Sequence, residues 1–123
     1  MEFKDIEAIK AEIIEGKNFL KCISQVHPKE IKRILEDVYE LYKYNFSEYL
    51  QDEYNSHRLF NIKYDKDDNI ISASLMCYYY DGCEINLTCK GIEVVYNPEN
   101  GPEKIITELP WKFVKMYFPA EIC

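Results

Sequence analysis

Apolar residues at the start of the chain recur every three or four positions, which is the spacing of one face of an amphipathic helix. These residues are Ile6, Ile9, Ile13 and Ile14, and charged residues lie between them. Gly16 is typical of a helix end, so we predict that the first helix stops there. Residues 18–26 fit either a short helix or a strand, and we favour a helix.

The next segment predicts a second, longer helical region. Pro28 suits the first helical position, and Glu30 places a negative charge in the first turn, where the helix dipole favours it. The apolar stripe then runs through Ile31, Leu35, Val38, Tyr42, Phe46 and Tyr49, widened by Ile34 and Leu41, and it reaches about Tyr54. Asn45 and Glu48 read as a capping pair, so a break near Asn45 is an alternative.

Short apolar runs at regular spacing predict an antiparallel meander of four strands in the second half of the chain. The runs are Arg58–Tyr64, Ile70–Tyr80, Cys83–Cys89 and Ile92–Tyr96, and the turns between them are Asp65–Asn69, Asp81-Gly82 and Lys90-Gly91. An Asp-Gly pair is a strong signal for a two-residue hairpin turn. We expect the first and fourth runs to be the sheet edges, which leaves pairing of two copies through those edges open.

A register built on these turns, with Tyr64 opposite Ile70, gathers apolar residues on one face. That face holds Phe60, Ile62, Tyr64, Ile70, Ser72, Ser74, Met76, Tyr78, Cys83, Ile85, Leu87, Cys89, Ile92, Val94 and Tyr96. A slip of one residue would move a strand's whole set to the other face, so we expect this face to pack on the helices. The opposite face keeps an apolar row from Ile71 to Tyr79, which we expect the C-terminal segment to cover.

The C-terminal segment allows two interpretations. Lys104–Leu109 can form a fifth strand, and Pro110 can instead begin a last short helix. The sequence therefore predicts an α+β fold, with N-terminal helices on one face of a four-stranded antiparallel meander and a C-terminal helix or fifth strand. We expect one domain over residues 1–123, helical over 3–56, β over 58–97 and with a C-terminal segment over 102–119. This order of elements resembles the cone-like fold of nuclear-transport-factor-2-type domains, in order alone.

Composition narrows the kinds of partner. Hydrophobic residues make up 47% and charged residues 30%, a balance typical of a globular protein. The net charge is −7, which argues against direct binding to nucleic acid or an anionic membrane and is compatible with a basic protein partner. Lysines outnumber arginines thirteen to two, which indicates an AT-rich bacterial or phage genome.

The five cysteines bear on cellular location. Residues Met1 to Lys10 are charged and lack the apolar core of a signal peptide. We therefore expect a cytoplasmic, reducing setting in a bacterial or phage-infected cell, with the cysteines as free thiols.

Candidate metal sites fail on spacing. Asp65, Asp67 and Asn69 match the start of a calcium loop, but Ile70 stands where that loop needs glycine and Met76 where it needs glutamate. Cysteines at positions 77, 83 and 89 are spaced by six, and the predicted register divides them between two faces. We interpret the acidic segment as a hairpin turn and the thiols as small buried hydrophobes, and we expect no metal and no cofactor.

One row of the predicted register suggests chemistry. It places Cys77 between His57 and Asn86, and a thiol beside a histidine and an asparagine is the arrangement of a thiol nucleophile. Nothing in the sequence supplies an oxyanion hole, and the four glycines form no phosphate-binding loop. We therefore favour a coincidental row, and a protein that is not an enzyme.

Eleven tyrosines in 123 residues suggest a binding surface, because tyrosine is enriched at interfaces. The candidate partner-binding residues lie on the second helical region: Glu36, Asp37, Tyr39, Glu40, Tyr44, Glu48, Asp52, Glu53 and Tyr54. We predict a non-catalytic acidic protein that inhibits a basic, nucleic-acid-acting protein, as anti-CRISPR and toxin-immunity proteins do. The alternative is a small-molecule pocket or minor enzyme site between helices and sheet, where Ser72 and Ser74 leave room.

Overall fold

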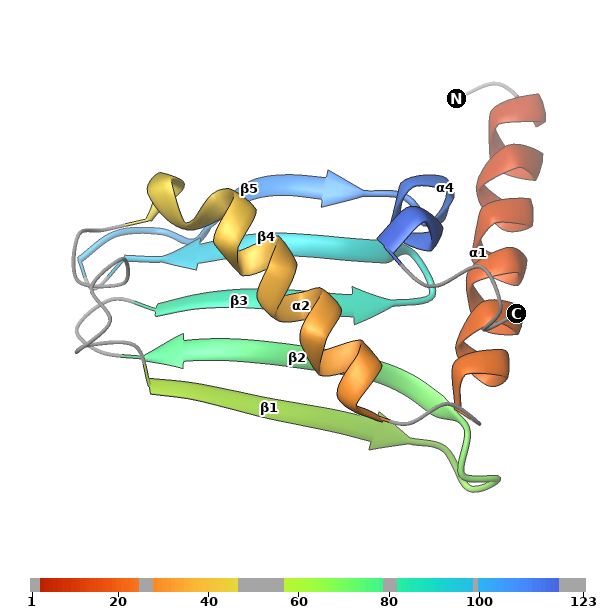
Figure 1. Cartoon of the computed structure of the whole chain (residues 1–123). Helices are drawn as coiled ribbons and strands as arrows, with labels where there is room; N and C mark the ends of the chain where they lie inside the picture. The colour runs from red at the N-terminus through yellow and green to blue at the C-terminus, as the bar shows by residue number, and fades with distance from the viewer. Residues whose placement is uncertain (1–2, 25–27, 47–56, 79–81, 99, 118–123) are drawn as a thin grey trace.

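The fold is described from a computed structural model, over residues 3–24, 28–46, 57–78, 82–98 and 100–117. The helical elements are α1 (Phe3–Ile23), α2 (Pro28–Tyr42), α4 (Trp111–Val114) and two 3₁₀ turns, Lys43–Asn45 and Lys115–Tyr117. The strands are β1 (His57–Tyr64), β2 (Ile70–Tyr78), β3 (Gly82–Thr88), β4 (Gly91–Asn97) and β5 (Lys104–Leu109). Figure 1 shows α2 lying across one face of the sheet, with α1 and α4 at one end of it.

The five strands form one antiparallel sheet in the order β1-β2-β3-β4-β5. This confirms the α+β class and the meander. Both interpretations of the C-terminal segment hold, because β5 is a fifth strand and α4 follows it. The predicted sheet edge at Ile92–Tyr96 is wrong, since β5 pairs with β4 and becomes the edge strand itself.

Helix α1 does not stop at Gly16 but continues to Ile23, which confirms the helix favoured for the start of segment 18–26. Gly16 is buried, and a Cβ atom there would overlap the carbonyl oxygen of Cys89 and the indole of Trp111. The glycine therefore allows α1 to pack closely on the β3–β4 turn and on α4. It does not end the helix.

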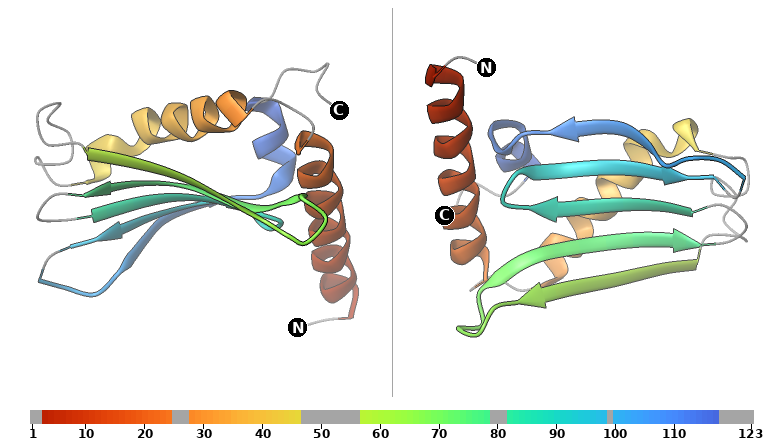
Figure 2. Two further views of the ribbon diagram at one scale, coloured as in Figure 1. Left: turned by 90° about the horizontal axis from the view of Figure 1, so that it is seen from below. Right: turned by 180° about the vertical axis from the view of Figure 1, so that it is seen from behind.

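The N-terminal half of α1 projects past the sheet on the side opposite α2 (Figure 2). Its stripe of isoleucines is consequently not core, because Ile6, Ile9 and Ile14 are all exposed. The same stripe becomes buried only further along the helix, at Leu20 and Ile23.

Helix α2 supplies the centre of the core. Ile31, Ile34, Leu35 and Val38 are fully buried against the sheet, as the stripe predicted, whereas Leu41 points to solvent. The α-helix ends at Tyr42 and a 3₁₀ turn continues to Asn45, close to the predicted break. Residues 47–54 of the predicted helix lie outside the described residues.

The predicted register is wrong for β2. Tyr78 pairs with Gly82, so three residues separate the strands where we expected the two-residue turn Asp81-Gly82. Ala73, Leu75 and Cys77 consequently face α2 and are buried. The buried residues of β3 and β4 stay on the predicted face: Ile85, Leu87, Ile92 and Val94.

The predicted pair Tyr64–Ile70 is present, but the β1–β2 register shifts beside it, between Lys63 and Tyr64. This irregularity brings Ile62 opposite Ala73, on the face that packs on α2. Ala73, Leu75 and Cys77 of the apolar row of β2 are therefore buried beneath α2, whereas Ile71 is exposed. We expected the C-terminal segment to cover that row. Instead, Trp111 and Val114 of α4 are buried at the end of the sheet beside α1 and β4.

Candidate protein-binding face

The sheet face opposite α2 carries no helix across it among the described elements (Figure 2). Polar side chains follow one another across all five strands of this face. Asn61 lies opposite Ser74, and Ser74 lies opposite Asn86. Asn86 lies opposite Glu93, and Glu93 lies opposite Glu108. We call this set, Asn61, Ser74, Asn86, Glu93 and Glu108, the polar row.

The polar row ends in two like charges. Glu93 and Glu108 are direct cross-strand neighbours, an arrangement that destabilises a sheet. No hydrogen bond or ion pair joins either carboxylate to another residue that the structure describes. A third glutamate, Glu84, stands on the same face and accepts a hydrogen bond from Asn86 Nδ2 at 3.3 Å. The acidic end of this face therefore holds no ion pair within the described chain, although Lys90 lines the same surface hollow as Glu93 and Glu108.

An apolar row runs beside the polar row. Leu59 lies opposite Met76, and Met76 lies opposite Glu84, which interrupts the apolar row. Beyond Glu84 the row continues with Val95, which lies opposite Ile105. Leu59 and Ile105 are 52% and 54% exposed. A face that combines exposed apolar side chains with unpaired charge has the composition of a protein interface, since interfaces join an apolar centre to a polar rim.

Of the acidic residues predicted on the second helical region, Asp37 and Glu40 lie on α2 and are already in ion pairs. Arg33 bonds both Glu30 and Asp37, each at 3.0 Å. Glu40 forms ion pairs with Lys43 at 2.8 Å and with Arg58 at 3.7 Å. The helix is consequently less able than the sheet face to attract a basic surface.

The predicted tyrosines divide between core and surface. Tyr39 is 1% exposed and belongs to the core, so its prediction as a surface residue is wrong. Tyr44 is 75% exposed beside Lys43, and Glu36 is half-buried on α2. The remaining predicted residues lie outside the described residues: Glu48, Asp52, Glu53 and Tyr54.

The predicted row of Cys77, His57 and Asn86 is also wrong. Arg58 and Cys83 are the residues opposite Cys77 on its two sides. His57 lies opposite Tyr78, and Asn86 lies opposite Ser74. Cys77 itself is completely buried, so the proposed nucleophile has neither its base nor access to substrate.

The thiols differ from the expectation of five free cysteines. Cys77, Cys83 and Cys89 are free, whereas Cys22 is disulfide-bonded. Within the described ranges, no group of three histidine, cysteine or acidic side chains is placed to hold a metal ion.

Burial, together with the neighbouring sulfur atoms of Cys77 and Cys83, raises the pKa of Tyr39 to about 12, against a positive charge and a hydrogen bond from Arg58 that lower it. The Arg58 guanidinium lies 4.5 Å from the centre of the Tyr39 ring. Folding therefore favours the neutral phenol over phenolate.

This shift predicts a loss of stability at high pH that depends on Tyr39. The unfolded phenol ionises near its ordinary pKa of 10.0 and the folded one near 12. The contribution of Tyr39 to stability is fully present below the unfolded pKa, and about 3 kcal/mol is lost as pH rises through the folded pKa. Urea unfolding of wild type and Tyr39→Phe at several pH values isolates the effect. Parallel stability curves between pH 10 and pH 12 would contradict it.

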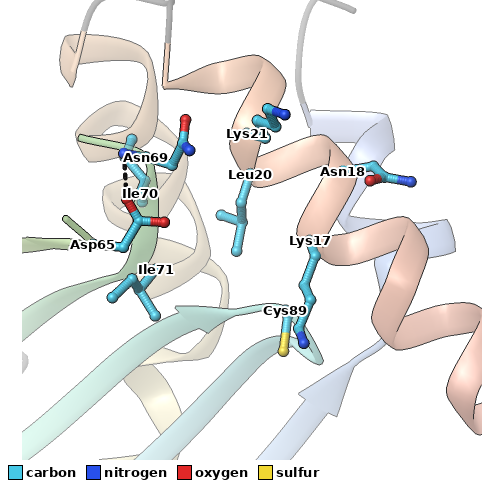
Figure 3. Close-up of a pocket in the computed structure, with 9 residues that line it drawn as sticks. All are labelled: Lys17, Asn18, Leu20, Lys21, Asp65, Asn69, Ile70, Ile71 and Cys89. Carbon is cyan, nitrogen blue, oxygen red and sulfur yellow. Dashed lines mark hydrogen bonds between the residues drawn. The ribbon is translucent and has the colours of Figure 1, made fainter. Parts of the chain in front are cut away.

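A pocket of about 380 Å³ lies between α1 and the turns that join β1 to β2 and β3 to β4 (Figure 3). Lys17, Leu20, Asp65, Ile71 and Cys89 are among the residues that line it. The alternative pocket was expected between the helices and the sheet. The described part of that interface holds fully buried core side chains, such as Leu35 and Val38 of α2 and Leu75 of β2. Ser72 and Ser74 belong to the opposite, uncovered face.

Comparison of the chain with protein-family models, with curated proteins and with solved structures finds no match. In the part of the chain that the structure describes, no helix has the length and apolar character needed to cross a bilayer.

Proposed function

We propose that the protein is a non-catalytic binding protein that inhibits or neutralises a basic protein partner through the uncovered face of its sheet. The observation that carries the proposal is the opposed pair Glu93 and Glu108, neither of which forms an ion pair with a residue that the structure describes. Like charges opposite each other reduce stability, and a lysine or arginine from a partner between them would turn that cost into attraction.

The surroundings of the pair suit a protein rather than a small ion. Ile105 is exposed on the same strand and face as Glu108, and Leu59 is exposed on the same face at the opposite edge of the sheet, on β1. The N-terminal half of α1 projects on the same side of the sheet as that face (Figure 2), and Ile6 and Ile9 of this helix are exposed. A partner with basic residues around an apolar patch would bury both kinds of surface at once.

The acidic charge of the sheet face suggests the class of protein partner. Proteins that act on nucleic acid carry basic surfaces for phosphate, and an acidic face can occupy such a surface. We therefore propose a nuclease-like or other nucleic-acid-acting partner, as for anti-CRISPR or immunity proteins, with no direct nucleic-acid or membrane binding. We also propose a cytoplasmic setting, which the free thiols at Cys77, Cys83 and Cys89 support and the disulfide at Cys22 does not.

The test compares two variants with equal changes of charge in an affinity pull-down from bacterial lysate, washed at low and high salt. Glu93→Gln/Glu108→Gln removes two charges from the sheet face, and Glu36→Gln/Asp37→Asn removes two from α2. We expect a basic protein to be captured by wild type and the α2 variant, to be lost from the sheet variant, and to be released by salt. Capture that is indifferent to salt, or lost only from the α2 variant, would contradict the proposed face.

The same pair predicts an effect on stability in the isolated protein. Glu108→Gln removes the repulsion and should raise the free energy of unfolding by about 0.5 kcal/mol. Urea denaturation measures the change, and Glu12→Gln on the exposed side of α1 is the matched control, with no change expected. A stability below that of wild type would show that Glu108 makes a favourable contact and would remove the basis of the proposal.

A further inference from the structure

Two buried thiols lie side by side on the core face of the sheet. Cys77 on β2 is directly opposite Cys83 on β3, and their exposed fractions are 0% and 1%. The pKa of each thiol is shifted chiefly by hydrogen bonding with the other. The proposed binding face is on the other side of the sheet, so this pair has no part in it.

The position of the pair suits a covalent bond. Residues opposite each other on antiparallel strands have Cα atoms about 4.5–5.5 Å apart. Disulfides join Cα atoms about 4.4–6.8 Å apart, so the two sulfurs can bond without separation of the strands.

A positive charge stands beside the pair. Arg58 on β1 is the residue opposite Cys77 on its other side, and its guanidinium stacks on Tyr39. The hydrogen bond from Cys83, together with the charge of Arg58, holds the pKa of Cys77 below its usual range. The same hydrogen bond and burial raise the pKa of Cys83. Cys77 is therefore the thiol that ionises first, and Cys83 is the one that follows.

We propose that Cys77 and Cys83 are a thiol–disulfide exchange site, which reacts with low-molecular-weight disulfides of the glutathione class and closes into a disulfide between β2 and β3. This inference is independent of the proposed binding function.

The reaction balances as two successive exchanges. The Cys77 thiolate attacks one sulfur of the reagent, so a bond forms between them and one reagent thiolate leaves. Cys83 then gives its proton to that thiolate, and its sulfur attacks Cys77 Sγ. The bond from Cys77 to the reagent breaks, and the second reagent thiolate leaves and takes up the proton that Cys77 released. The two cysteines lose two electrons, and the reagent becomes two thiols.

Burial sets the rate of this reaction. Because both sulfurs are shielded, the reagent reaches Cys77 only when the ends of β2 and β3 open locally. Cys89, which is partly exposed, offers a comparison thiol in the same chain.

The experiment treats reduced, folded, full-length protein with oxidised glutathione at neutral pH, blocks remaining thiols with iodoacetamide and digests with chymotrypsin without reduction. Chymotrypsin cleaves after tyrosine, and three tyrosines at 78–80 separate the two cysteines. We expect a pair of peptides joined through Cys77 and Cys83, lighter by two hydrogen atoms than the separate thiols and released by a reductant.

Three variants sharpen the result. Cys83→Ser should leave Cys77 carrying one glutathione, and Cys89→Ser should form the cross-link as wild type does. Arg58→Gln should slow the cross-link at neutral pH and recover speed at higher pH, because its role is to favour the Cys77 thiolate. The proposal is overturned if folded protein yields no Cys77–Cys83 peptide, if the peptide forms only in urea, or if Cys83 pairs with Cys89.

Discussion

Replacement of Trp111 by alanine should lower the free energy of unfolding by about 3–5 kcal/mol, the range for removal of a buried aromatic side chain. Trp111 is buried where α4 meets α1 and the β3–β4 turn. Its ring lies 5.0 Å from that of Phe19 between centroids, and its Nε1 donates a hydrogen bond to the carbonyl oxygen of Thr88 at 3.0 Å. Alanine would leave a cavity and an unpaired carbonyl where these elements join.

Two further variants separate these contributions. Trp111→Phe keeps most of the apolar surface and loses the hydrogen bond, so its cost should be about 1–3 kcal/mol. Phe113→Ala, two residues further along and on the exposed side of α4, should change stability by less than about 0.5 kcal/mol. Urea unfolding followed by circular dichroism suits all three, because Trp111 is the only tryptophan. A loss below about 1 kcal/mol for Trp111→Ala would mean that α4 is not part of the cooperative core.

Much of the fold could be predicted because the periodicity of its elements is strong. The stripe of α2 and the alternation on β3 and β4 identified residues that are buried in the structure, such as Leu35, Ile85 and Val94. Helical spacing over residues 6–14 also predicted a helix correctly, although its apolar face is exposed. Periodicity predicts whether a segment is a helix or a strand. It does not show how much of that helix or strand a neighbouring element covers.

The register of β2 could not be predicted because that strand is apolar on both faces. Either Leu75 or Met76 could be buried in a core, so the face of β2 that packs on the helices had to be predicted from the length of the following turn. An Asp-Gly pair indicates a two-residue turn, but three residues separate the paired ends of β2 and β3. A difference of one residue exchanges the two faces of the strand.

The candidate binding face depended on that register and on β5. Glu93 alternates with the apolar residues Ile92 and Val94, which places it on the other face of its run, but nothing local in the sequence brings Glu108 opposite it. β5 carries a register irregularity where Val94 and Val95 pair with it, which alternation alone does not reveal. The helix acids were visible in the sequence, whereas their ion pairs with Arg33, Lys43 and Arg58 required the structure.

Gly16→Val should destabilise the protein by more than about 3 kcal/mol, above the usual cost of overpacking, because backbone stands in the way. Any side chain there would overlap the carbonyl oxygen of Cys89 as well as the indole of Trp111. Gly16→Ala should cost about 2 kcal/mol, since steric overlap is partly offset by roughly 1 kcal/mol gained from helix propensity. Ala11→Val, exposed on the same helix, is the control and should cost about 0.6 kcal/mol.

A double variant tests whether Trp111 and Gly16 form one packing unit. Trp111→Ala opens space beside Gly16, so Gly16→Val should cost less in that background than in wild type, by about 0.5–3 kcal/mol. The Cys89 carbonyl remains in place, so the penalty should not vanish. Strict additivity of the two changes in urea unfolding would show that the valine is accommodated by movement of α1 away from the sheet. The helix would then be held by Leu20 and Ile23 alone, and the glycine would not set its distance from the β3–β4 turn.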